Sequence, residues 1–367
     1  MAEPAFTIGV EEEYQIVDAQ TKELTGRSQS LIQNNEAAPT DQEIVHELFR
    51  CEVEIATDVC ETLSDVRQAL TKARRAVIDA AQETGSAIAA AGTHPFSRWE
   101  SQQITPKDRY YALNADLGRM IRELIILGCH VHVGVEDREI AVGIMNRSRT
   151  WLPTLLALTA NSPFWEGEDT GYDSYRMALW SRLPTAGPPP FFADYADYQS
   201  FIQQLIDTGI TDDPTKVYWD IRLSERFPTI EFRMSDVCAS IDEAVMLAGI
   251  VRALARTCYQ DILAGKAAVP VKGEMLKAAM WQASRYGLSG ELIDFTKMQP
   301  VPAKTSVETL LAYIQPALSD HGDESVVTSE VTRILSEGNS AQRQRKTYEE
   351  TDSLEAVVSE IAQRSAP

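Results

Sequence analysis

Five segments of the chain alternate apolar and polar residues, and no other feature constrains the fold as strongly. Successive side chains of a β-strand point to opposite faces of the sheet, so every second residue shares a face. In the first segment Ile8, Val10 and Tyr14 share one face, whereas Glu11 and Glu13 share the other. The pattern predicts an antiparallel sheet with one apolar and one polar face. The predicted strands are Phe6–Val17, Phe49–Thr57, Cys129–Val135, Val217–Leu223 and Thr229–Ser235.

The polar face of this sheet has an unusual composition. A face that is merely in water explains the alternation, but it is usually filled with Thr, Lys, Ser and Gln. Like charges on neighbouring strands cost stability, whereas Mg²⁺ draws carboxylates together and shares them with substrate phosphates. Arginines on the same face would bind phosphate or carboxylate oxygens. The composition therefore indicates a metal–nucleotide site. The polar residues of the five strands are Glu11, Glu13, Gln15, Glu52, Glu54, His130, His132, Asp220, Arg222, Glu231 and Arg233.

The pair His130 and His132 leaves more than one chemistry open. With a third ligand, the two rings would form a catalytic zinc site and indicate a metal-dependent amide hydrolase. Both histidines would alternatively be structural, hydrogen-bonded on a covered face. Because acidic residues outnumber histidines here, we favour at most one histidine as a ligand in an oxygen-rich Mg²⁺ or Mn²⁺ site.

Charge and missing motifs narrow the range of functions. The chain has 367 residues and a net charge of −20, which disfavours nucleic acid and anionic membrane surfaces as partners. A polyphosphate remains compatible, because a divalent cation can carry it into an acidic site. No P-loop, Gly-x-Gly-x-x-Gly or Gly-x-Ser-x-Gly motif is present. ATP would therefore be held by metal ions and arginines.

We expect a cytoplasmic protein without membrane-spanning segments. No basic segment followed by an apolar one marks a signal peptide. The most apolar helical stretch, Ala244–Leu254, is interrupted by Arg252. The number of cysteines is odd and none forms a Cys-x-x-Cys pair, so we interpret them as reduced, buried residues. They are Cys51, Cys60, Cys129, Cys238 and Cys258.

The rest of the chain is predicted to be mainly helical. A short buried strand is expected at Ala87–Gly92, and the Gly-, Pro- and aromatic-rich stretch Asn161–Phe192 is expected to be an ordered, functional loop. No domain boundary is evident, so residues 1–367 are predicted to form one domain whose part from about residue 270 is helical. The predicted helices are Leu63–Thr84, Asp108–Leu127, Asp137–Thr159, Ile241–Ala264, Gly273–Tyr286, Ser306–Ser319, Glu324–Glu337 and Ser353–Arg364.

Ordered motifs along the chain also resemble a family. They occur in the order of the YbdK-like carboxylate–amine ligases, within the glutamate–cysteine ligase type 2 family, and the similarity runs from about Phe6 to Tyr286. It implies an α+β, glutamine-synthetase-like catalytic fold, a curved antiparallel sheet forming a funnel with helices packed on its outer face. The motifs are Gly9–Tyr14, Glu54–Val59, Gly92–Phe96, His130–Gly134, Asn161–Trp165, Asp169–Tyr172, Trp219–Arg222 and Glu231–Arg233.

The resemblance also implies a reaction. ATP would phosphorylate a carboxylate, expected to be the γ-carboxylate of glutamate, and cysteine or another amine would attack the acyl phosphate to form an amide. The partners would be small molecules, and a homodimer is plausible. Two alternatives stay open, the amide hydrolase built on His130 and His132 and a catalytically inactive nucleotide-binding sensor.

The resemblance assigns roles by position. Glu13, Arg222 and Arg233 would be catalytic, and the two arginines with His132 would contact the nucleotide. Glu47 and Glu52 are weaker candidates for metal binding. The implied metal ligands are Glu11, Glu13, Glu54, Glu231 and His132. The residues implied to bind the substrate carboxylates are Thr93, His94, Arg109 and Arg176, although Arg109 could simply pair with nearby acids and His94 could simply shape a turn.

Overall fold

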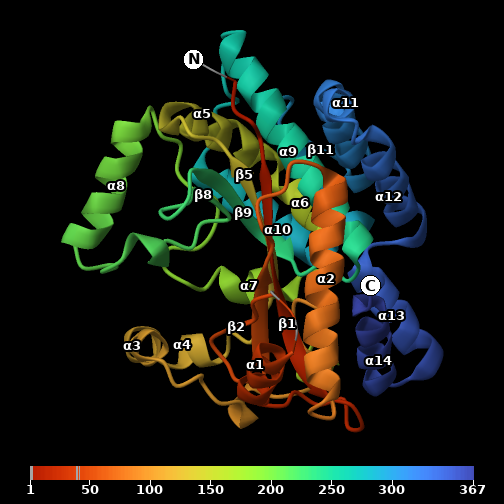
Figure 1. The fold of residues 1–367 in the computed structure, drawn as a ribbon. Helices are drawn as coiled ribbons and strands as arrows, with labels where there is room; N and C mark the ends of the chain where they lie inside the picture. The colour runs from red at the N-terminus through yellow and green to blue at the C-terminus, as the bar shows by residue number, and fades with distance from the viewer. Residues whose placement is uncertain (1–2, 39, 41) are drawn as a thin grey trace.

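A seven-stranded sheet organises the molecule. The computed structural model describes residues 3–38, 40 and 42–367. The strand order is β2-β3-β1-β5-β9-β8, with β4 also paired to β1 (Figure 1). Every pair of neighbouring strands is antiparallel, which confirms the predicted sheet. The strands are β1 (Ile8–Asp18), β2 (Val45–His46), β3 (Glu52–Ala56), β4 (Ser86–Ala89), β5 (Gly128–Gly134), β8 (Ile221–Leu223) and β9 (Thr229–Asp236).

The strand register brings the polar residues of distant segments together. Glu11 of β1 lies opposite His130 of β5, and Glu13 lies opposite Glu54 of β3. On the other side of β5, His132 lies opposite Glu231 of β9. Because paired residues share a face, these side chains form one continuous polar surface.

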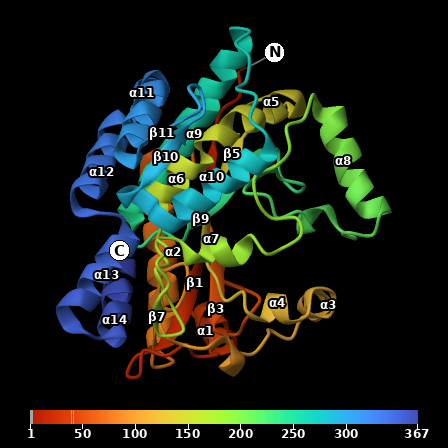
Figure 2. The same cartoon turned by 180° about the vertical axis from the view of Figure 1, so that it is seen from behind.

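Helices cover the apolar face of the sheet. α2 (Leu63–Gln82) packs on β1 and β4, α6 (Leu152–Thr159) packs on β9, and α9 (Ile241–Leu263) packs on β5 and β1. Figures 1 and 2 show the C-terminal helices on one side of this layer and α3, α4 and α8 on the other. The remaining helices are α1 (Ser28–Ala37), α3 (Asp108–Leu117), α4 (Arg119–Arg122), α5 (Arg138–Ser148), α7 (Tyr175–Trp180), α8 (Tyr195–Asp207), α10 (Gly273–Tyr286), α11 (Ala303–His321), α12 (Glu324–Glu337), α13 (Ser340–Thr351) and α14 (Leu354–Ser365).

Two predicted helices are each divided in the structure. The helix predicted at Asp108–Leu127 breaks at Gly118, whose φ of 60° lies in a region that helical residues do not adopt. The chain beyond α4 then runs into β5 in place of further helical turns. The helix predicted at Asp137–Thr159 is interrupted at Arg149–Trp151, because Pro153 has no N–H to continue the hydrogen-bond ladder and instead begins α6.

Several elements were not predicted. These are α1, α8, α13, the strand β2, the hairpin β10 (Glu291–Asp294) with β11 (Gln299–Pro302), and the pair β6 (Phe164–Trp165) with β7 (Glu168–Asp169). The stretch Asn161–Phe192 is ordered as expected, and α7 lies within it. The sequence carried a signal for α8, since Asp194 caps its N-terminus and Tyr198 and Ile202 repeat at helical spacing.

The apolar face of β1 contains one charged residue. Glu12 is completely buried among the apolar side chains and forms an ion pair with Arg74 of α2. Arg74 also donates to the carbonyl oxygens of Cys238 and Ser365. Ser365 in turn accepts the backbone N–H of Ala90 at 2.9 Å, so α14 is attached to the sheet.

The structure bears on the expected absence of membrane-spanning helices and on the expected state of the cysteines. Within the described residues, no helix is long and apolar enough to cross a membrane. All five cysteines are free and buried, as expected.

Candidate active site

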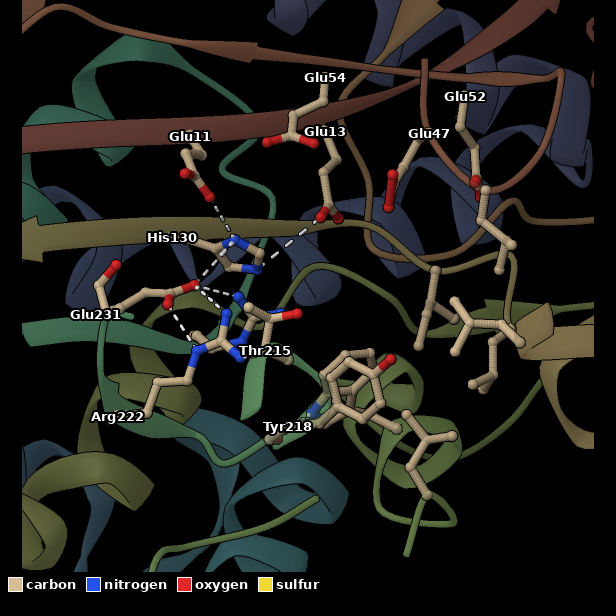
Figure 3. A pocket seen from close by; sticks show the side chains of 18 of the residues that line it. Glu11, Glu13, Glu47, Glu52, Glu54, His130, Thr215, Tyr218, Arg222 and Glu231 are labelled. Carbon is tan, nitrogen blue, oxygen red and sulfur yellow. Dashed lines mark hydrogen bonds and ion pairs between the residues drawn. The ribbon is translucent and has the colours of Figure 1, made fainter. Parts of the chain in front are cut away.

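The polar face of the sheet forms one wall of a cavity of about 310 Å³ (Figure 3). Strands β1, β3, β5, β8 and β9 all contribute side chains to it, and α3 and α7 close the opposite side. The structure thus gathers most of the predicted site residues in one place. Those that line the cavity are Glu11, Glu13, Glu47, Glu52, Glu54, Arg109, His130, His132, Arg176, Arg222, Glu231 and Arg233.

Glu11, His132 and Glu231 form a candidate metal cluster. Each offers one ligand atom, and these atoms lie within 4.8 Å of one another. His132 Nδ1 lies 2.9 Å from the Thr229 hydroxyl, while its Nε2 faces Glu11 Oε1 at 3.3 Å without making a hydrogen bond. When Nδ1 donates to Thr229, the Nε2 lone pair and a carboxylate oxygen point at each other, an arrangement that a cation between them would stabilise. Two carboxylates and one imidazole suit Mg²⁺ or Mn²⁺.

Neighbouring polar and charged groups lower the pKa of the two carboxylates of this cluster. Burial alone would raise the pKa of Glu11, but the hydrogen bond from His130 and the proximity of the His130 and His132 rings outweigh it and hold that pKa well below its usual range. Burial likewise opposes ionisation of Glu231, and the adjacent Arg233 and Arg222 lower its pKa well below normal. Both residues are therefore ready to bind a cation at neutral pH.

The two arginines beside Glu231 differ in what they can still bind. Arg222 donates Nε to Glu231 at 2.7 Å and Nη1 to two backbone carbonyl oxygens at 2.8 Å, so most of its N–H groups are occupied. This geometry makes Arg222 a residue that orients Glu231, in contrast to the expected direct contact with phosphate. Arg233 also pairs with Glu231 and lines the cavity, and its buried Nε has no partner. Arg233 is thus the better placed of the two to meet an anionic substrate.

Glu13, Glu47, Glu52 and Glu54 form a second acidic group beside the candidate metal cluster. Burial raises the pKa of each of these carboxyls. The charge of Glu47 raises the pKa of Glu52 and Glu54 further, whereas the charges of Arg109 and Arg233 act against the rise at Glu47. Glu13 accepts the backbone N–H of Gly128 at 2.6 Å. Glu52 Oε1 is buried without any partner. Glu13 and Glu54, predicted as metal ligands, therefore lie in this second group and outside the candidate metal cluster.

The histidine pair does not form a joint metal site in the described residues. His130 Nδ1 lies 3.1 Å from Glu11 and its Nε2 lies 3.9 Å from Glu13, so the ring bridges the two acidic groups. The candidate metal cluster contains His132 but not His130. This arrangement fits the preference for a single histidine ligand.

Arg176 and Arg109 enter the cavity from helices that cover the sheet. Arg176 of α7 is buried, and its Nη1 lies 4.0 Å from Asp236. Asp236 accepts hydrogen bonds from Ser162 and Ser174, so it attaches the segment before α7 to the sheet. The ring of Trp180 lies under the guanidinium groups of Arg176 and Arg233, at 5.8 and 5.7 Å. This segment is therefore part of the cavity wall.

Thr93 and His94 do not line the cavity. The Thr93 hydroxyl donates to the carbonyl oxygen of Phe164 at 2.7 Å. His94 Nδ1 accepts two backbone N–H groups, and its Nε2 lies 2.9 Å from the carbonyl oxygen of Lys22. All of these polar atoms are occupied within the protein. The contacts match the alternative for His94, a residue that shapes a turn.

Other residues depart from the predicted site. Asp220 and Gln15 belong to the polar pattern but do not line this cavity, and Asp220 faces a separate cavity of about 450 Å³. Aliphatic and aromatic residues of the cavity were not predicted, because they come from helices and loops without a strand pattern. Their only sequence signal is an apolar face on Asp108–Leu127. They include Leu48, Tyr110, Leu113, Ile121, Leu124, Ile126, Trp180, Leu183 and Tyr218.

Comparisons with known proteins cover the whole chain. A family model described as "Glutamate-cysteine ligase family 2(GCS2)" matches residues 7–360. A protein of Rhodopirellula baltica named "Putative glutamate--cysteine ligase 2" is 41% identical over 365 residues, 98% of this chain and 97% of its own length. One of Rhodospirillum rubrum with the same name is 39% identical, covering 100% and 97%.

Solved structures share the fold at low identity. Glutamate–cysteine ligase from Francisella tularensis, in complex with AMP, superposes with a TM-score of 0.74 at 12% identity and covers 100% of this chain and 90% of that one. A bifunctional glutathione synthetase from Pasteurella multocida gives a TM-score of 0.70 at 14% identity, covering 98% and 51%. The expected α+β fold, with an antiparallel sheet and helices on its outer face, is thereby confirmed.

Proposed function

This chain belongs to glutamate–cysteine ligase family 2, and we propose that it is an ATP-dependent ligase that joins a carboxylate to an amine. The proposed donor is the γ-carboxylate of glutamate, and the reaction passes through an acyl phosphate that the amine attacks. The observation that carries the proposal is the Glu11–His132–Glu231 cluster beside Arg233, within a cavity that four further arginines also line. Such a site supplies the metal binding and positive charge that phosphoryl transfer requires.

Each residue of the site then has a physical role. Glu11, His132 and Glu231 would hold Mg²⁺ or Mn²⁺, and such an ion would offset the negative charge of the ATP phosphates. Glu13 and Glu54 face the same space and stay proposed as further ligands. The residues fit such an ion because ionised carboxylate oxygens and an unpartnered imidazole nitrogen are already adjacent.

The chain's own residues would orient the phosphoryl group and the donor. Arg233 presents its guanidinium to the transferring phosphoryl group, and Arg222 keeps Glu231 in place. Arg176 and Arg109 are proposed to bind the donor's carboxylates. Acyl phosphates hydrolyse readily, so Trp180, whose ring lies under two of these arginines, contributes by excluding water.

The direct test is substrate-dependent ADP release. The purified protein is incubated with ATP, Mg²⁺, glutamate and one amine at a time, and ADP and the amide are quantified. We expect both products only when donor and amine are present together. The variant Glu231→Gln should abolish product formation, whereas Glu349→Gln, at an exposed site on α13, should not. Absence of ADP above background with every amine would refute the ligase assignment.

The same experiments separate the alternatives. Tightly bound zinc at about one per chain, with activity that needs no ATP, would indicate the amide hydrolase. Binding of Mg²⁺–ATP without turnover for any amine would indicate the inactive sensor. A cytoplasmic location, a homodimer and the single-domain assignment stay predictions.

A further inference from the structure

The cavity has two chemically different ends. The candidate metal cluster and its arginines lie at one end, and Glu47 and Glu52 lie on the opposite side of the space in Figure 3, with Tyr218 across from them. Six branched aliphatic side chains also line the cavity, and we call them the apolar wall. The apolar wall consists of Leu48, Leu113, Ile121, Leu124, Ile126 and Leu183.

The apolar wall presents more apolar surface than glutamate or cysteine would cover. Leu113 and Ile121 come from α3 and α4, Leu124 and Ile126 follow α4, and Leu48 and Leu183 come from the segments before β3 and after α7. All six are buried in a second hydrophobic core. Ile125, between two members of the wall, is buried in the same core but does not line the cavity. Glutamate carries charged groups, which lose hydration against aliphatic surface. Cysteine offers only one methylene and a thiol, so neither substrate fills this end of the cavity with apolar atoms.

The carboxylate of Glu52 lines the same cavity as the apolar wall and indicates that the ligand also carries a cationic group. Glu52 is 1% exposed, and its Oε2 accepts the backbone N–H of Phe49 at 3.1 Å. Its Oε1 has no partner, although a buried carboxylate oxygen without one is costly. Glu47 lies within electrostatic reach of Glu52 and accepts the Tyr110 hydroxyl at 3.3 Å. Leu48 of the apolar wall directly follows Glu47, and the acids and the wall line the same cavity.

We propose that the acceptor is a primary amine with a bulky apolar group, of isobutyl size or larger, whose ammonium binds Glu52 while the apolar wall encloses its body. The proposal rests on the ligase function above and specifies its second substrate. Unbranched or small amines would leave the wall in contact with water.

A panel of amines tests the proposal at fixed glutamate, ATP and Mg²⁺. The acceptors are leucine, phenylalanine, 3-methylbutylamine, cysteine and glycine, and the readout is kcat/KM from ADP and amide formation. We expect the better of leucine and 3-methylbutylamine to exceed cysteine at least about tenfold, since single methylene differences in apolar pockets already give such ratios. Comparison of these two shows whether the acceptor's own carboxylate is recognised.

The outcomes separate this inference from the ligase function itself. Cysteine or glycine performing as well as the bulky amines would overturn the inference and leave the ligase function intact. Turnover with none of the amines would refute the ligase function.

Two matched variants locate the selectivity. Ile126→Val removes one methyl group from the apolar wall and should lower kcat/KM for the bulky amine about fourfold relative to glycine. Ile125→Val removes the same group from the neighbouring core position and should leave this ratio unchanged. Equal effects of the two variants would contradict selection by the wall.

A third variant tests the ammonium site. Glu52→Gln can still accept the N–H of Phe49 but carries no charge, so it should raise KM for the amine about tenfold or more while KM for ATP and the Mg²⁺ requirement stay constant. A change in the Mg²⁺ requirement with an unchanged KM for the amine would mean that Glu52 binds metal and would overturn its proposed role.

Discussion

Replacing Arg74 by methionine should destabilise the protein severely without touching the cavity. Arg74 and Glu12 are both completely buried, and Arg74 donates Nη2 to Glu12 at 2.6 Å and Nε to it at 3.0 Å. The remaining N–H groups bind the carbonyl oxygens of Cys238, Ala239 and Ser365. Methionine fills similar space but leaves the buried carboxylate of Glu12 without its positive partner, with the Tyr14 hydroxyl still donating to it, and leaves these carbonyl oxygens without the donors of Arg74.

The expected loss in the free energy of unfolding follows from removing the positive partner of Glu12. Breaking a buried ion pair from one side costs about 3–5 kcal/mol, because the remaining charge stays uncompensated. The carbonyl oxygens add to this cost, so we expect a loss near the upper end of that range. Replacing both partners, Glu12→Leu with Arg74→Met, removes the unpaired charge, and the double variant should lie within about 2 kcal/mol of the wild type.

Urea unfolding followed by circular dichroism measures all four members of this double-mutant cycle. ADP release under native conditions serves as the control for the site, since Glu12 points away from the cavity. The reasoning fails if Arg74→Met costs less than about 1 kcal/mol, or if the double variant is as unstable as Arg74→Met.

Three further predictions concern the site and its surroundings. Glu13→Gln should abolish turnover while thermal stability stays equal or rises, because burial and the charge of Glu47 already disfavour its ionised form; a clear fall in Tm would mark it as a structural partner. Thr229→Val removes the hydrogen-bond partner of His132 Nδ1. After dialysis against EDTA, this variant should need about 10- to 100-fold more Mg²⁺ or Mn²⁺ than the wild type for ADP formation. An unchanged metal requirement would exclude His132 as a ligand. Burial lowers the pKa of His94 from 6.5 to about 4, so its neutral ring contributes stability above pH 6.5 that is lost as the pH falls toward 4. Between pH 7 and 5 the wild type should lose about 2 kcal/mol more than His94→Asn in urea unfolding, and equal losses would contradict a buried neutral ring.

The sheet and the gathering of the site could be predicted because alternation fixes which side chains share a face. Once Glu11, His132 and Glu231 are assigned to the polar faces of their strands, pairing of β1, β5 and β9 is enough to bring them together. The same rule does not show which residues of that face reach the cavity. Asp220 obeys the alternation yet faces another cavity, because it lies just before β8 and outside the paired strand, whereas Arg222 within β8 lines the site.

What could not be predicted depends on contacts between distant segments. Nothing near Glu12 in the sequence shows that Arg74, on a helix, will neutralise it. The backbone carbonyls that occupy Arg222 come from a loop whose path only the fold defines. The motif around His94 is conspicuous in the sequence, but its ring is used to hold a turn.

The bond between Arg74 and Ser365 also bears on how the chain is made. These two residues are 291 positions apart, and Arg74 joins the first long strand through Glu12. During synthesis the strands and α2 leave the ribosome long before residue 365 does. The buried network can therefore be completed only after translation has passed that point, and a polypeptide that stops earlier lacks the Ser365 carbonyl that accepts from Arg74. Such an incompletely folded fragment would be a target for the proteases and chaperones of the cell.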